Sequence, residues 1–380
     1  MHDRASRIAK ILLKITLFLA VLLGIGYALL PQPEKRPESP KNPLSLLLAD
    51  DWDAAPHSVA EIQLPNDHGS HRHAGIEIWQ LFGRFQTRIA QVFGFECTWI
   101  RVDLGGDPEQ RNSAWASDQI FHLDYSVIPY DQGSIRRESA SSRGALGLAG
   151  YDRTQRKLWL YRQALRFPEP GAAAASIELT IPDGEYPMRL RFFPKKALID
   201  APLDAPFRYY AMPRMKIFGT LKLAQNEQPV EGEAWFEHSW GKLPLGSGQL
   251  IRNRFLLQLS NGMEMNLWQS GRRDGSGRSL NSGFLVSTEG AARPLSAKQA
   301  RVEAEGYWTS ESSAIRYPLN WRLELPEQSM LLQIKPWRED QEATDFQTRW
   351  SGLVSISGHR GGDPLTGYGL LQLSGYAPHD

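Results

Sequence analysis

Repeated strand–turn–strand units are the feature of this sequence that most limits how it can fold. The stretch RFLLQLSNGMEMNLWQS places Asn261-Gly262 between two segments of alternating apolar residues. Both central positions of a tight hairpin favour positive φ, which Asn and Gly adopt readily, so this stretch predicts a β-hairpin. Further turns are predicted at Asp183-Gly184, near Asn226 and at Gly361-Gly362. Short strands with turns about every ten residues are typical of an antiparallel sandwich or barrel.

Length and composition favour two globular β domains. At 380 residues the chain exceeds the usual size of one core. Its 12 Trp, 12 Tyr and 15 Phe favour strands over helices. Because 43 Lys and Arg balance 42 Asp and Glu, no nucleic-acid partner is expected. The single cysteine, Cys97, lies among apolar residues, so it is expected to be buried and inert, with no disulfide framework and no cysteine-rich zinc site.

The N-terminus predicts export. Four Arg and Lys residues within the first 14 precede an uncharged apolar run, Ile15 to Leu30. The positive-inside rule then leaves the N-terminus in the cytoplasm. Residues 1–30 are either a single-pass anchor in the inner membrane, which we favour, or a signal peptide cleaved near Ala28. Residues 31–45 form a Pro-rich linker. The body is thus expected in the periplasm, tethered or, after cleavage, free.

Four ordered motifs carry a resemblance to a known family. They are LPNDHGSHRHAGIEIWQLFGRF, FRYYAMPRMKIFGTL, VEGEAWFEHSWG, and RWSGLVSISG followed by GYGLLQLSGY. Together they resemble the family that includes AttH-like proteins and bacterial carotenoid hydratases, over most of residues 60–380. The resemblance implies an all-β fold of two lipocalin-like antiparallel barrels in tandem. We place them at residues 46–232 and 233–380, and the helical periodicity is confined to short pieces such as residues 44–51 after the linker.

The departures from the family pattern bear on activity. In the hydratase branch, the resemblance assigns the chemistry to a His-x-Trp pair and a Tyr-x-Asp pair. The corresponding positions here hold Arg208, Tyr210, Trp235 and Glu237. Of these, only Glu237 has the same chemical group as the family residue, a carboxylate in place of Asp. Carotenoid hydration is therefore not predicted.

Glu237 is the one candidate for a catalytic acid, because a carboxyl in an apolar barrel can have its pKa raised. The alternative, which we favour, is a structural ion pair of Glu237 with Arg208 or Arg214 between the barrels. Aromatic and polar residues of the same motifs are the predicted ligand-binding set: Trp235, His238, Trp240, Tyr209, Tyr210, Arg214, Glu77 and Trp79.

Two other polar groups have structural and functional interpretations. Asp67, His68, His71 and His73 could hold a metal if the backbone turns, but a loop closing the barrel mouth is favoured because the resembling family carries similar residues without a known metal. We therefore expect no metal and no cofactor. His122 and Asp124 alternate on one strand face, and Glu77 and Trp79 do so on another, so both pairs could point inward. Polar residues inside a barrel are more often hydrogen-bonded core pairs than ligand contacts, and both interpretations stay open for these pairs.

Three functions remain open from the sequence. The first is binding of a hydrophobic small molecule in a barrel or between barrels. The second is an enzyme of the same fold, a lyase or isomerase that uses Glu237 as its acid. The third, implied by the resemblance, is an accessory protein of an ABC-type exporter that contacts its permease.

Overall fold

The computed structural model describes residues 61–105, 113–131, 133–171, 175–200, 207–241, 250–273, 280–296, 298–344 and 348–378. The expected membrane segment, linker and short helical piece lie outside these ranges. Within them, no helix is long and apolar enough to cross a membrane.

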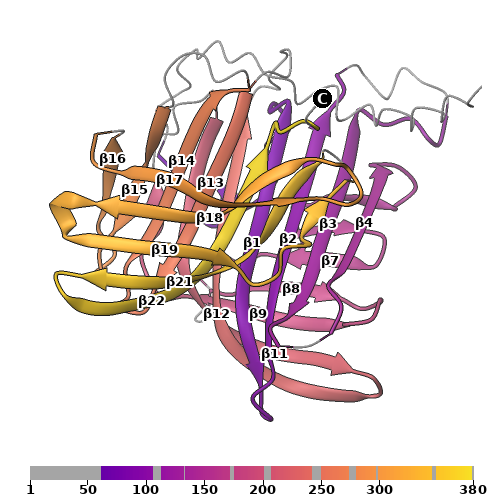
Figure 1. Cartoon of the computed structure of the whole chain (residues 1–380). Helices are drawn as coiled ribbons and strands as arrows, with labels where there is room; N and C mark the ends of the chain where they lie inside the picture. Colours follow the sequence, from indigo (N-terminus) through magenta and orange to yellow (C-terminus); the bar gives the residue numbers. More distant parts are fainter. Residues whose placement is uncertain are drawn as a thin grey trace, which may run out of the picture. The chain divides into compact units, whose positions relative to one another are not determined.

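The first antiparallel sheet is built from the N-terminal half of the described chain (Figure 1, indigo to pink). Its strands are β1 (Ile76–Thr87), β2 (Val92–Asp103), β3 (Gln119–Pro129), β4 (Arg136–Arg143), β5 (Ala149–Asp152), β6 (Lys157–Leu160), β7 (Gln163–Arg166), β8 (Ile177–Ile181), β9 (Met188–Pro194), β10 (Ile199–Asp200), β11 (Phe207–Leu223) and β12 (Asn226–Gly241). They pair in the order β4-β3-β2-β1-β12-β11-β9-β8-β7-β6-β5, with β10 beside β11. A short 3-10 helix, η1 (Asn66–His68), precedes β1.

The second antiparallel sheet follows in sequence (Figure 1, orange to yellow). Its strands are β13 (Leu250–Leu259), β14 (Glu264–Arg272), β15 (Leu280–Val286), β16 (Ala292–Ser296), β17 (Arg301–Thr309), β18 (Arg316–Leu325), β19 (Met330–Pro336), β20 (Glu342–Ala343), β21 (Arg349–Arg360) and β22 (Asp363–Ser374), with the 3-10 helix η3 (Pro326–Gln328) before β19. The order is β16-β15-β14-β13-β22-β21-β19-β18-β17, and β20 pairs with β21. The two curled, nearly closed sheets confirm the predicted pair of lipocalin-like barrels.

The predicted turns are confirmed and explain the strand order. Gly262 adopts φ 81° between β13 and β14, and Gly184 adopts φ 90° between β8 and β9. The segment between β11 and β12 and the Gly361-Gly362 pair also turn the chain between paired strands. Each turn reverses the chain between neighbours, so most pairings are local hairpins. Cys97 is fully buried in the first barrel, and burial raises the pKa of its thiol.

The change of sheet lies later in the chain than the predicted domain boundary after residue 232. β12 runs from Asn226 to Gly241 and pairs with β1 and β11 along its length, so the motif VEGEAWFEHSWG belongs to the first barrel. The second sheet begins at Leu250. The physical reason is the hairpin between β11 and β12, which continues the first sheet through the motif.

Candidate functional site

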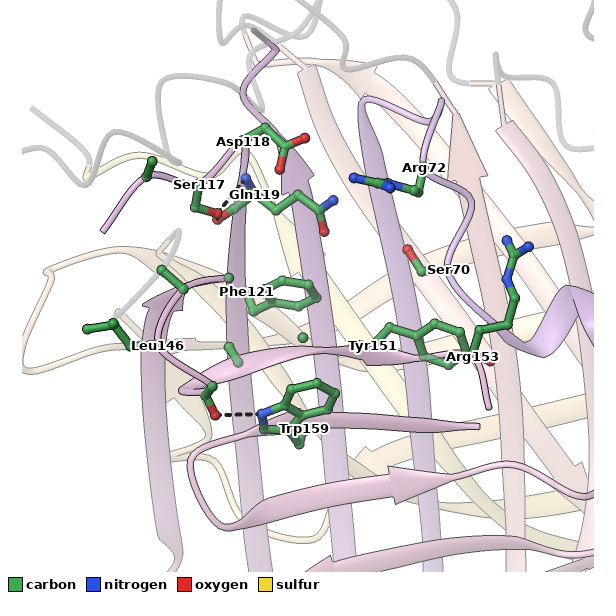
Figure 2. Close-up of a pocket in the computed structure, with 16 residues that line it drawn as sticks. Ser70, Arg72, Ser117, Asp118, Gln119, Phe121, Leu146, Tyr151, Arg153 and Trp159 are labelled. Carbon is green, nitrogen blue, oxygen red and sulfur yellow. Dashed lines mark hydrogen bonds between the residues drawn. The ribbon is translucent and has the colours of Figure 1, made fainter. Parts of the chain in front are cut away.

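A pocket of about 630 Å³ opens at one end of the first barrel (Figure 2). It is lined by the loop before β1, the start of β3, the connection from β4 to β5 and the hairpin of β5 and β6. Phe121, Tyr151 and Trp159 give it aromatic surface, and its charged side chains are those of the exposed Arg72 and Arg153 and of Asp118, which leaves one net positive charge. The Trp159 indole is fixed by donating a hydrogen bond to the Gly147 carbonyl at 2.9 Å. The pocket therefore combines apolar walls with a few polar groups, as small-molecule sites do.

None of the predicted ligand-binding residues lines this pocket. Strand alternation instead divides them into two sets. Residues that face the core of the first barrel are Glu77, Trp79, Tyr210, His238 and Trp240. Residues that face the second sheet are Tyr209, Arg214, Trp235 and Glu237. The four aromatic side chains expected to wall one pocket thus belong to two separate clusters.

Glu237 lies in the set that faces the second sheet, and its carboxylate is surrounded by donors. Arg254 of β13 binds it in a bidentate fashion, with Nη1 2.6 Å from Oε1 and Nη2 2.8 Å from Oε2. The Tyr209 hydroxyl donates to Oε2 at 3.0 Å and the Trp235 indole at 3.2 Å. Tyr209 in turn accepts a hydrogen bond from the Asn266 amide at 2.9 Å. Because both oxygens are engaged, the geometry is that of a structural ion pair.

The expected partners of Glu237 were wrong, although the expected pairing between barrels is present. Arg208 binds Asp200 through two 2.7 Å contacts. Arg214 contacts Glu233 at 2.7 Å and Glu264 of β14 at 2.5 Å. The arginine that pairs with Glu237 is Arg254, which was not predicted as a site residue.

His122 and Asp124 do not point into the barrel. Phe121, Leu123 and Tyr125 fill the core, so the residues between them face outward. Asp124 accepts a hydrogen bond from Arg349 of β21 at 2.5 Å, and His122 contacts the Ser141 hydroxyl at 2.7 Å. Glu77 and Trp79 do point inward.

A buried polar cluster lies beside the pocket around Glu77. Its Oε2 accepts hydrogen bonds from Arg101 Nε at 2.9 Å and from the Ser70 hydroxyl at 3.0 Å, and Ser70 also lines the pocket. Its Oε1 lies 2.7 Å from His71 Nδ1 and 3.1 Å from His238 Nε2. Burial acts to raise the pKa of Glu77, but hydrogen bonds from His238 and His71, with the charge of Arg101, outweigh it and hold that pKa far below its usual range. Glu77 is therefore ionised.

The structure separates the four residues first considered as a metal group. Asp67 and His71 join Glu77, since His71 Nε2 lies 3.3 Å from Asp67 Oδ1. His68 turns away into the barrel, where Nδ1 lies 2.6 Å from the Tyr210 hydroxyl. His73 is exposed. Among the described residues, one His/Glu group that could hold a metal is formed by His71, Glu77 and His238, whose ligand atoms lie within 4.8 Å of one another.

Sequence reasoning missed Arg101, Arg254 and the pocket residues Phe121, Tyr151 and Trp159. The inward direction of Arg101 and Phe121 could have been predicted, because each lies on a strand with an alternating apolar pattern. The partners of Arg101 and Arg254 are 24 and 17 residues away in sequence, where no local pattern reaches.

Comparisons with known proteins agree with the fold. A crystal structure described as a candidate AttH from Nitrosomonas europaea is 21% identical, with a TM-score of 0.71, covering 85% of this chain and 100% of that chain. Kievitone hydratase from Nectria haematococca is 12% identical, with a TM-score of 0.64, covering 83% of this chain and 93% of that chain. Among curated proteins, none matches the sequence. The family model described as AttH-like matches residues 55–376, so this chain belongs to the AttH-like family.

Proposed function

We propose that this protein binds a hydrophobic small molecule that carries an anionic or strongly polar group, at the mouth of the first barrel. The observation that carries the proposal is the pocket of about 630 Å³, a volume within the usual range of small-molecule sites. Phe121 and Trp159 offer apolar surface to the body of such a ligand. Arg72 and Arg153 offer donors to its polar group.

Glu237 has no part in this proposal. It does not line the pocket, and its two oxygens bind Arg254, Tyr209 and Trp235. A general acid must present its proton to the reacting atom, within about 3 Å of it. The similarity to kievitone hydratase, at 12% identity, supports the fold and does not supply a catalytic acid.

An anilinonaphthalene sulfonate dye tests the proposal, because it joins an aromatic body to an anion. The dye is expected to bind the full-length protein in detergent, with its fluorescence raised. Trp159→Ala and the double variant Arg72→Ala/Arg153→Ala are each expected to weaken binding by about tenfold, which corresponds to roughly 1.4 kcal/mol.

Two matched controls accompany these variants. Trp235→Phe alters a buried tryptophan that faces the second sheet, and Arg166→Ala removes an exposed cation of β7 outside the pocket. Both are expected to keep the affinity within about twofold, which is less than roughly 0.5 kcal/mol. Equal dye affinity in wild type, Trp159→Ala and the double arginine variant, all folded, would refute the proposed site.

We further propose that the body is tethered to the inner membrane and faces the periplasm. The support is the row of cations before an uncharged apolar run at the N-terminus. Alkaline phosphatase fused after Asp380 is expected to be active, and an inactive but expressed fusion would contradict the topology. Contact with an ABC-type permease stays a prediction, to be tested by crosslinking in the native membrane.

A further inference from the structure

We propose that His71, Glu77 and His238 bind one divalent transition-metal ion. This goes beyond the proposed ligand pocket and does not rest on it. The three residues come from the loop before β1, from β1 and from β12, and their ligand atoms lie within 4.8 Å of one another. Ligands held at about 2.0–2.2 Å in a tetrahedral site lie roughly 3.3 Å apart. The contacts of 2.7 and 3.1 Å from Glu77 Oε1 to the two imidazoles are already close to that spacing.

The hydrogen-bond partners of His238 are the first argument. Its Nδ1 lies 2.9 Å from the Asp67 carbonyl oxygen and its Nε2 lies 3.1 Å from Glu77 Oε1, so both nitrogens face acceptors. A neutral imidazole has one N–H and therefore cannot donate to both acceptors. A metal ion on Nε2 removes this conflict, because Nδ1–H can then donate to Asp67 while the Nε2 lone pair binds the ion.

The outer partners of the cluster are the second argument. Imidazoles that bind metals usually donate their other N–H to a carboxylate or a backbone carbonyl. His71 has the Asp67 carboxylate at 3.3 Å from Nε2, and His238 has the Asp67 carbonyl. The ring of His71 stacks on Trp240 at 3.9 Å and that of His238 stacks on Trp79 at 4.6 Å. Both rings are thus oriented before any ion arrives.

The donor set indicates the class of metal. Two imidazoles and one carboxylate suit zinc, iron, cobalt or nickel, whereas calcium and magnesium prefer oxygen ligands throughout. Three protein ligands leave at least one coordination position open. The side chain of His71 is 25% exposed, which gives an ion access, while Glu77 and His238 are fully buried.

Metal titration of the full-length protein tests the site. The protein is purified in detergent without a histidine tag, treated with a chelator and titrated with Co²⁺, whose visible absorption reports coordination. One ion per chain is expected, and elemental analysis checks the stoichiometry. His71→Ala is expected to weaken binding by more than about 100-fold, because loss of outer partners alone costs about 10- to 100-fold. The matched control is His73→Ala, an exposed histidine of the same loop, with affinity unchanged within about twofold.

Thermal melting gives a second readout that does not depend on absorption. Added Co²⁺ or Zn²⁺ is expected to raise the melting temperature of wild type and of His73→Ala, because an ion that binds the folded state stabilises that state. Folded His71→Ala lacks one ligand, so its melting temperature is expected to stay unchanged. Two outcomes overturn the proposal. One is no bound ion and no melting shift in the wild type with Co²⁺, Zn²⁺, Ni²⁺ or Fe²⁺. The other is metal binding by folded His71→Ala at the wild-type affinity.

Discussion

At the residue scale, His68, His71 and His73 show how neighbouring residues of one type acquire different roles. His73 is exposed, His71 binds Glu77, and His68 is buried against Phe167, with ring centroids 5.3 Å apart and nearly parallel. The sequence could place all three in a loop near a barrel mouth. It could not separate them, because their directions depend on the turn at η1 and on strands far away in the chain.

His68 makes folding stability depend on pH. Burial, with smaller contributions from His238 and Arg156, lowers its pKa to about 3 from the ordinary value of 6.5. Between these values the unfolded chain takes up a proton at this residue and the folded chain does not. The stability contribution of neutral His68 is therefore complete above about pH 6.5 and is lost progressively as the pH falls toward 3.

The prediction is a difference between wild type and His68→Gln. From pH 8 to pH 5 the wild type is expected to lose about 2 kcal/mol more of unfolding free energy, since each pKa unit corresponds to about 1.4 kcal/mol. Denaturant unfolding at several pH values measures it. His73→Gln, at an exposed histidine, should follow the wild-type curve. If wild type and His68→Gln change in parallel with pH, His68 is not held neutral by the fold.

At the element scale, β12 explains which part of the site was predictable. The strand was predicted from its alternation, but the four aromatic residues expected in one pocket lie in two clusters. Successive side chains of a strand point to opposite faces, so Trp235 and Glu237 share one face while Phe236 and His238 share the other. The same holds for Tyr209 and Tyr210 on β11. Period-two alternation therefore already ruled out one pocket containing all four aromatic residues.

The pair of Glu237 and Arg254 links β12 to β13 and is expected to stabilise the protein. Their side chains are 7% and 18% exposed. Glu237→Gln leaves a largely buried guanidinium without its counter-charge, which is expected to cost about 3 kcal/mol. A double-mutant cycle with Arg254→Gln, followed by denaturant unfolding, should give a coupling above about 1 kcal/mol.

An exposed ion pair of the first barrel is the matched comparison. Arg162 and Asp183 lie 2.6 Å apart with side chains 72% and 42% exposed. Because solvent screens such pairs, their coupling is expected to stay below about 0.5 kcal/mol. A coupling as small between Glu237 and Arg254 would show that their contact does not stabilise the fold.

At the scale of the whole β body, the two sheets share one core as well as having their own. The shared apolar cluster draws Phe82 and Trp235 from the first sheet and Leu256, Phe284 and Leu370 from the second. The sequence predicted both barrels from their turns, which are local. It could not predict the contacts between them, because these join residues such as Asp124 and Arg349 that are 225 positions apart.

These shared contacts predict that the β body unfolds as one unit. Breaking either sheet would expose the apolar cluster and leave buried charges unpaired, which makes a state with one folded barrel unfavourable. Glu264 of β14 is the sharpest test, because its fully buried carboxylate binds both Lys196 and Arg214 of the first half, at 2.7 and 2.5 Å. Glu264→Gln is expected to lower the stability of both barrels together.

Two probes that report on different parts of the protein test whether both barrels unfold together. Far-ultraviolet circular dichroism follows all strands, and tryptophan fluorescence follows the cores; coincident transitions indicate a single cooperative unit. Glu264→Gln should still unfold in one transition, with its unfolding free energy lowered by about 3 kcal/mol. The denaturant midpoint should therefore fall by that loss divided by the m-value. Glu311→Gln, at an exposed carboxylate of the second half, should keep the wild-type midpoint. Separate transitions in the wild type, or a shift of only one of two transitions in Glu264→Gln, would mean that the barrels fold independently despite the ion pairs between them.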